Sequence, residues 1–128
     1  MLTEASRTFR AHPASLRLVR EFVRSQATEA DLDPIADDLV LAASEAAGNA
    51  IVHAVGDQVD VRWRQTEDVI EMEVTDRGVF KRRVPVAMAE GGRGIFVMMA
   101  LMDEVSIQEG QPGRPGTVVR LRKRVSGL

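Results

Sequence analysis

The 128-residue sequence contains no cysteine, which excludes disulfide bonds, thiolate metal sites and cysteine nucleophiles. It also has no excess of charge of either sign: the formal net charge of −2 gives no reason to expect nucleic acid as a partner. No stretch predicts a signal peptide or a membrane span, because the most apolar stretch is short and contains Glu, Asn and His. We therefore expect a cytoplasmic protein with one domain over residues 1–128 and one hydrophobic core.

The most informative stretch is LVLAASEAAGNAIVHAV, which lies within a helix predicted over residues 34–54. Glu45, Asn49 and His53 are four residues apart, and this spacing places them along one side of the helix. Apolar residues flank this stripe on both sides: Leu41 and Val52 on one, and Ile35, Ala42 and Ala46 on the other. We therefore expect the helix to be largely buried and its carboxylate to have a partner.

Two interpretations of Glu45 and Asn49 stay open at this point. Both can be core residues whose polar groups meet backbone or buried water, or both can belong to a functional site. In the second case, the asparagine supplies a neutral oxygen ligand of the kind that Mg²⁺ accepts, and the glutamate can act as a general base. His53 alone is more typical of a satisfied core histidine than of a ligand or base.

Asp76 is a second candidate, because of its place after two predicted strands. Alternating apolar and charged residues predict strands over 59–64 and 70–74, and opposite charges on their outward faces fit antiparallel neighbours. Continuing the inward row of the second strand places Asp76 on the core side, just before Gly78 turns the chain away. Asp76 is either a structural cap of that turn or a second carboxylate that faces the interior.

A third candidate is the glycine-rich stretch that precedes another apolar helix. Residues 79–91 show no clean periodicity and predict a loop or lid. Gly92, Arg93 and Gly94 then lead directly into IFVMMALM, which predicts a buried helix. Glycines at a helix start let backbone amides approach an anion closely, although a tight turn explains a lone GxG equally well.

The N-terminal segments predict a short strand over 5–11 and a helix over 14–27. Arg17, Arg20 and Arg24 form a basic row on this helix, called the arginine stripe below. The stripe is either a solvated face or a docking surface for an acidic partner helix.

The C-terminal segments predict a strand around 105–107 and a last strand over 117–124, in which Thr117 points inward. The resulting order of elements favours an α+β fold. We predict a two-layer sandwich in which the helices cover one face of a mainly antiparallel mixed sheet.

Taken together and in order, these motifs resemble the GHKL (Bergerat) ATP-binding fold shared by gyrase, histidine kinases and MutL. Within that fold, the chain is most similar to the bacterial anti-sigma factor serine kinases of the SpoIIAB and RsbW type. Four segments carry the resemblance: SEAAGNAIVHA, VTDRG, GGRGIFVMMALMDEV and GTVVRLRKR. An isolated catalytic domain of a histidine kinase agrees less well with these motifs, because Glu45 stands where histidine kinases usually have asparagine.

The resemblance implies roles for the residues on the phosphate side of an ATP site. Asn49 would bind the Mg²⁺ ion that bridges the ATP phosphates, and Glu45 would accept the proton of the substrate serine. Gly92 and Gly94 would present backbone amides to the phosphates, with Arg93 adding positive charge. Few residues suffice, because phosphoryl transfer relies on positioning and electrostatics.

On the adenine side, the resemblance implies that Asp76 accepts a hydrogen bond from the exocyclic amine of the base and that Thr117 assists this contact. Gly78 would allow the base to approach closely. It further implies a homodimer that sequesters an alternative sigma factor and phosphorylates a STAS-domain anti-anti-sigma protein on serine, with no direct contact to nucleic acid or membrane.

Two features depart from that family pattern. Phe80 stands where relatives often have a second glycine, and the lid is short. They favour an alternative function: a nucleotide-binding regulatory module of weak or no catalytic activity, which acts only by sequestering its protein partner.

Overall fold

The structure, a computed structural model, describes residues 2–53, 56–76, 93–109 and 116–126. In chain order the elements are β1 (Thr3–Arg10), the 3₁₀ turn η1 (Pro13–Ser15), α1 (Leu16–Glu29), α2 (Asp33–His53), β2 (Gln58–Gln65), β3 (Val69–Asp76), α3 (Arg93–Leu101), β4 (Glu104–Gln108) and β5 (Val118–Arg124). The predicted lid over 79–91 lies outside the described residues. None of the helices described here is long and apolar enough to cross a membrane.

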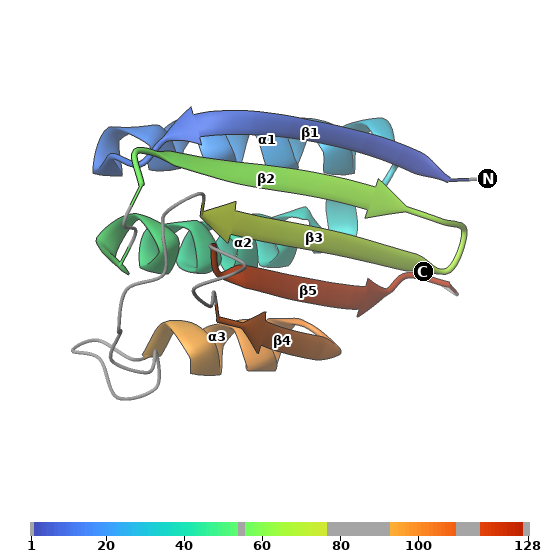
Figure 1. The fold of residues 1–128 in the computed structure, drawn as a ribbon. Helices are drawn as coiled ribbons and strands as arrows, with labels where there is room; N and C mark the ends of the chain where they lie inside the picture. The colour runs from blue at the N-terminus through green and yellow to red at the C-terminus, as the bar shows by residue number, and fades with distance from the viewer. Residues whose placement is uncertain (1, 54–55, 77–92, 110–115, 127–128) are drawn as a thin grey trace.

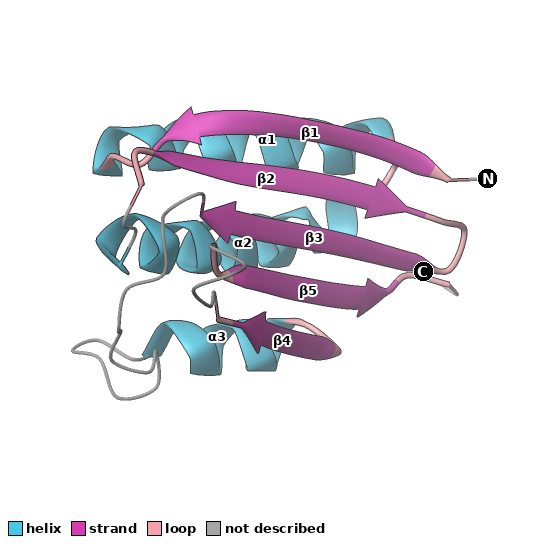
Figure 2. Ribbon diagram, in the orientation of Figure 1, coloured by secondary structure: helices cyan, strands magenta, loops and turns pink. Residues whose placement is uncertain are grey.

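The five strands form one sheet in the order β1-β2-β3-β5-β4. The three helices lie behind this sheet in the view of Figures 1 and 2, so they cover one of its faces. This arrangement confirms the predicted α+β sandwich. Every pairing among the described strands is antiparallel, so the parallel pair that a mixed sheet would contain does not occur among them.

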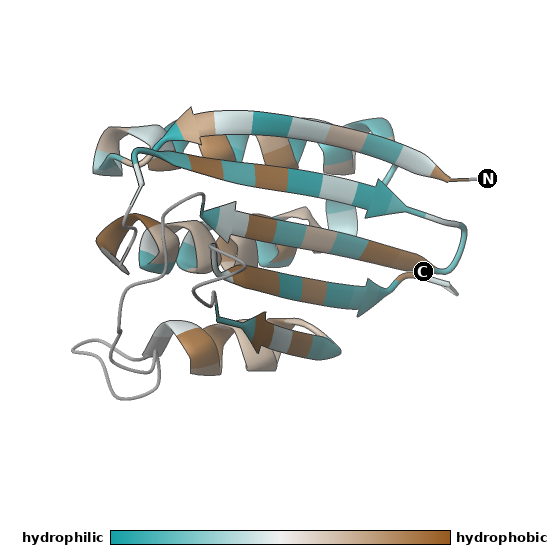
Figure 3. Cartoon of the chain, in the orientation of Figure 1, coloured by the Kyte–Doolittle hydropathy of each residue, from teal (hydrophilic) through white to brown (hydrophobic). Residues whose placement is uncertain are grey.

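The core lies between the sheet and the helices, as the alternation of the strands predicts. Val59, Val61 and Trp63 of β2 are each 1% exposed, and β3 and β5 continue the same inward row. Figure 3 shows the matching bands of apolar and polar residues along β2. Side chains alternate between the two faces of a strand, so every second residue faces the core once one of them does. The inward row of β3 therefore also decides where Asp76 points.

The opposite face of the sheet is polar, and none of the described helices lies over it. Its charges pair across neighbouring strands, as predicted for antiparallel partners: Glu4 with Arg62 and Arg64, Glu73 with Arg120, and Glu71 with Arg122. The arginine of each pair stays at least two-fifths exposed, so each pair contributes little to stability.

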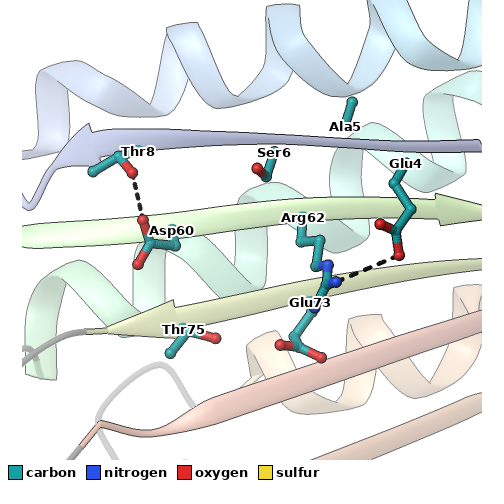
Figure 4. A pocket seen from close by; sticks show the side chains of 8 residues that line it. All are labelled: Glu4, Ala5, Ser6, Thr8, Asp60, Arg62, Glu73 and Thr75. Atoms are coloured by element: carbon teal, nitrogen blue, oxygen red, sulfur yellow. Dashed lines mark hydrogen bonds and ion pairs between the residues drawn. The ribbon is translucent and has the colours of Figure 1, made fainter.

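Between β1, β2 and β3, this outer face carries a shallow cavity of about 590 Å³, seen from close by in Figure 4. Thr8 donates a hydrogen bond to Asp60 at one end of it, and Glu4 pairs with Arg62 at the other. None of the described residues that were predicted to form the site lines this cavity.

The start of α1 follows from His12 and Pro13. The Nδ1 atom of His12 accepts a hydrogen bond from the amide of Ala14 at 3.0 Å, and Pro13 opens the 3₁₀ turn that leads into the helix. Val19 and Val23 then face the core, where they are 1% and 0% exposed. Helix and strand boundaries elsewhere agree with the predicted ones within a few residues.

The three arginines of the arginine stripe are all exposed, and each contacts another side chain of this protein. Arg17 pairs with Glu21 on its own helix at 3.6 Å. The other two reach α2: the Nη1 atom of Arg20 lies 3.4 Å from the hydroxyl of Ser44, and Arg24 pairs with Asp37 at 2.8 Å.

Helix α2 is less buried than predicted. Leu41 is 46% exposed and Val52 is 75% exposed, although both flank the polar stripe. The sheet lies beneath α2, and α1 and α3 both contact it, so one narrow face of α2 stays open to solvent. The expectation that apolar residues on both sides of the stripe are buried is therefore wrong for this side of the helix.

Candidate active site

Glu45 and Asn49 meet the start of α3. An atom placed at the Cβ position of Gly94 would lie 3.1 Å from Oε2 of Glu45 and 3.0 Å from Nδ2 of Asn49. Both distances are shorter than ordinary van der Waals contact, so only glycine fits here without moving these side chains. The structure thus brings together three residues that are separated by up to 49 positions in the sequence and were all predicted to belong to one site.

Asn49 has a polar atom that nothing in the described residues satisfies. Its Nδ2 atom is buried and has no hydrogen-bond partner among them. A buried donor without a partner costs about 1–3 kcal/mol, so such an atom needs an explanation. Because the amide can turn to present either its nitrogen or its oxygen, Asn49 suits an anionic group or a cation bound at the start of α3.

Asp76 ends β3 on the core side, as its place in the strand predicts. It is 1% exposed, and apart from Ser15 it is the one polar residue among the described ones that is classed as buried. Its backbone amide donates a hydrogen bond to the carbonyl oxygen of Thr117 at 3.1 Å. This bond continues the pairing of β3 with β5, and it fixes Thr117, which is half-buried, directly beside Asp76.

Gly116 is a positioning residue that the sequence analysis missed. Its φ angle is +98°, and a Cβ atom there would lie 2.5 Å from the carbonyl oxygen of Asp76. Only glycine allows this close approach of the chain to the end of β3. The glycine directly before the last predicted strand was the sequence feature that could have indicated it.

Two glycine-to-alanine substitutions are expected to change stability in opposite directions. Gly116→Ala should lower the free energy of unfolding by about 1–3 kcal/mol, because alanine is strained at a positive φ and clashes with Asp76. Gly48→Ala should raise it by about 0.5–1 kcal/mol, because nothing lies within 4 Å of the new Cβ and α2 gains a better helix former. Urea denaturation of both variants measures this. Equal effects of the two substitutions would contradict the geometry at Gly116.

The residues fall into two groups at one end of the molecule. Glu45, Asn49 and Gly94 form the first group, and Asp76 with Thr117 forms the second. In Figure 1 the end of β3, the start of β5, the C-terminal end of α2 and the start of α3 all lie at the left.

The remaining predicted site residues stay predictions. Gly78 and Gly92 lie outside the described residues. Arg93 is the first residue of α3, and His53 is the last of α2.

The geometry of this end of the sandwich suits an ATP-type ligand. The start of α3 and the buried amide of Asn49 offer a place for a phosphate group. The carboxylate buried at the end of β3 offers a place for a base that donates a hydrogen bond. The chain matches the family model described as "Histidine kinase-like ATPase domain" over residues 9–123. It therefore belongs to the histidine kinase-like ATPase family.

Relatives narrow this class to the RsbW and anti-sigma F factor group, as the sequence motifs predicted. The chain is 33% identical over 112 residues to the "Anti-sigma F factor" of Caldanaerobacter subterraneus, covering 75% of this chain and 77% of that protein. It is 32% identical over 109 residues to the "Serine-protein kinase RsbW" of Bacillus velezensis, covering 71% of this chain and 66% of the relative, just under two thirds of its length.

A solved structure agrees with this assignment. The crystal structure of the RsbU and RsbW domains of a Mycobacterium tuberculosis protein matches with a TM-score of 0.70 at 26% sequence identity. The match covers 95% of this chain and 32% of that longer chain.

Proposed function

We propose that this protein is an ATP-dependent protein serine kinase and anti-sigma factor. The observation that carries the proposal is the contact of Glu45 with the first turn of α3, beside the unsatisfied amide of Asn49. This contact puts a potential base next to the place where a helix start can hold phosphate. The names of the relatives support the same activity.

On the adenine side, Asp76 accepts a hydrogen bond from the exocyclic amine of the base, and Thr117 assists this contact from the neighbouring strand. Burial of Asp76 supports this role, because a hydrogen bond to a carboxylate is stronger where water is excluded. Gly78 would let the base approach, but its position lies outside the described residues.

On the phosphate side, the backbone amides of Gly92 and Gly94 and the charge of Arg93 hold the phosphates at the positive end of α3. Asn49 is the residue that would hold Mg²⁺, because its Nδ2 atom has no partner among the described residues and the amide can turn to present its oxygen to a cation. When bound, Mg²⁺ neutralises charge on the phosphates during transfer.

In the transfer step, Glu45 takes the proton from the hydroxyl of the substrate serine. The serine oxygen forms a bond to the γ-phosphorus of ATP while the bond from that phosphorus to the β–γ bridging oxygen breaks. The products are phosphoserine and ADP, and the proton stays on the Glu45 carboxyl until it passes to solvent.

The proposed partners are an alternative sigma factor, which the protein sequesters in the cytoplasm, and a STAS-domain anti-anti-sigma protein, which it phosphorylates. We propose that it acts as a homodimer. The arginine stripe on α1 is the surface that we assign to partner contacts, because its three charges are exposed.

The test is to incubate the purified protein with labelled ATP, Mg²⁺ and a STAS-domain protein encoded in the same genome. We expect label on a serine of the STAS protein and none when Mg²⁺ is removed. Calorimetry with ATP is run alongside. ATP binding without any transfer would favour the alternative, a regulatory module that binds nucleotide and only sequesters its partner, which Phe80 and the short lid motivate.

A change at Gly94 should reduce transfer without unfolding the protein. In Gly94→Ala the new Cβ pushes the side chains of Glu45 and Asn49 away by a few tenths of an ångström. Because transfer depends on such positioning, the rate should fall by about tenfold. The free energy of unfolding should change by less than about 1 kcal/mol, because alanine favours the helix. An unchanged rate in the labelling assay would show that this contact does not set the position of Glu45.

A further inference from the structure

The open face of α2 has a composition that the fold itself does not explain. Leu41, Glu45, Gly48 and Val52 follow one another at spacings of four, three and four residues, which places them along one side of the helix. We call these four residues the α2 ridge. Leu41 and Val52 are 46% and 75% exposed, whereas Glu45 and Gly48 are half-buried between them.

Gly48 is the least expected residue of the α2 ridge. It lies in the interior of a helix, where glycine is unfavourable compared with alanine. No atom of the described residues lies within 4 Å of the position that a Cβ would take, so nothing among them requires glycine there. A partner protein that packs closely against α2 at this position would require glycine.

The charge of the α2 ridge restricts what can bind it. Glu45 is the one charged residue of the α2 ridge, and Asp38, which lies one turn before Leu41 on the same side of the helix, is the next charge along α2. Leu41 and Val52 are the exposed apolar side chains of the ridge, and they lie on either side of Glu45, which is about one turn after Leu41 and about two turns before Val52. The surface that binds the α2 ridge should therefore be apolar opposite Leu41 and Val52 and carry no negative charge opposite Glu45.

A second copy of this protein does not satisfy this condition. Two α2 ridges packed on each other about a two-fold axis would bring the Glu45 carboxylates of both copies toward one another. Like charges facing each other in an interface are unfavourable. A partner with a neutral hydroxyl opposite Glu45 avoids this cost, and it also places that hydroxyl on the proposed base.

We propose that the α2 ridge is the docking surface for the protein that this kinase phosphorylates, and that the acceptor serine of that protein is flanked by apolar side chains. One of these side chains packs over Gly48, between Leu41 and Val52, and so holds the serine hydroxyl at Glu45. The inference rests on the proposed kinase function, and it adds the surface and the kind of serine that the enzyme selects.

The experiment measures initial rates of serine labelling of a STAS-domain protein at several concentrations. Three variants, Leu41→Gln, Val52→Glu and Gly48→Ala, are compared with the unchanged protein. Each is expected to raise KM for the STAS protein by about fivefold or more, with the largest effect for Val52→Glu, which puts a charge in an apolar interface. Calorimetry should give the same Kd for ATP in all of them. Gly48→Ala is decisive, because it should stabilise the fold and still weaken docking.

Met99→Glu provides the matched control. Met99 is 60% exposed on α3, and on the helical wheel it lies on the side opposite Gly94 and therefore away from α2. Met99→Glu adds the same charge as Val52→Glu, and its KM for the STAS-domain protein should stay within about twofold of that of the unchanged protein.

Three outcomes would overturn the proposal, and they separate it from the proposed function. KM values within twofold in all three ridge variants would show that the partner docks elsewhere, although the kinase function would stand. A changed oligomeric state in light scattering, with KM unaltered, would make the α2 ridge a contact between copies. No labelling by the unchanged protein, with ATP still bound, would remove both the kinase function and the docking surface.

Discussion

Glu45→Gln is expected to lower the rate of serine phosphorylation by about 10²- to 10⁴-fold, the contribution usual for a positioned general base. Glutamine has the shape of glutamate, so its contact with Gly94 is kept while the ability to take up the serine proton is lost. The affinity for ATP should stay within about threefold, because the removed charge acts on the acceptor serine. Transfer of label in single-turnover assays, together with calorimetry, measures both quantities.

Asp38→Asn is a suitable control for this substitution. Asp38 lies two turns before Glu45 on the same side of α2, it is half-buried, and its change removes the same charge. Its rate should stay within about twofold of the original. If Glu45→Gln transferred phosphate as fast as Asp38→Asn, Glu45 would have no part in moving the proton.

Asp76→Asn should weaken ATP binding by about 10- to 100-fold, which corresponds to about 1.4–2.7 kcal/mol. The carboxylate of Asp76 is buried, so the proposed hydrogen bond to the exocyclic amine of adenine would be charge-assisted and shielded from water. GTP, which has no amine at that position, should bind the original protein weakly and should lose little in the variant. Calorimetry with both nucleotides measures the difference.

Glu73→Gln controls for the loss of a charge on the same strand. Glu73 lies on the outer face of β3, opposite to the face of Asp76, and it pairs there with Arg120 at 3.0 Å. Its affinity for ATP should stay within about twofold. An ATP affinity of Asp76→Asn within threefold of the original would remove Asp76 from adenine binding.

Much of this fold could be predicted because strand periodicity decides which side chains face inward. The alternation in β2 and β3 gave the phase of the sheet and therefore the burial of Asp76, which the structure confirms. The spacing of Glu45 and Asn49 likewise gave their common side of α2. Their contact with Gly94 could be proposed only through the resemblance, since it depends on how two helices pack.

The exposure of α2 could not be predicted, because a helical wheel ranks the sides of one helix and ignores its neighbours. A stripe with apolar flanks is buried on both sides only if other elements cover both sides. Here α1 and α3 contact α2, yet Leu41 and Val52 lie on a face that no other described element covers. Gly116 was missed for a similar reason: its need for a positive φ arises from the nearby backbone of Asp76, which is 40 residues earlier in the chain.

The bond between the amide of Asp76 and the carbonyl of Thr117 has a consequence for how the protein matures on the ribosome. Joining β3 to β5 closes a long loop, and contacts of this kind form late because the loop entropy opposes them. A nascent chain that has emerged only as far as α3 has the proposed base but an unfinished adenine cleft. Nucleotide can therefore stabilise the protein by mass action only after the final strand has been synthesised and has paired.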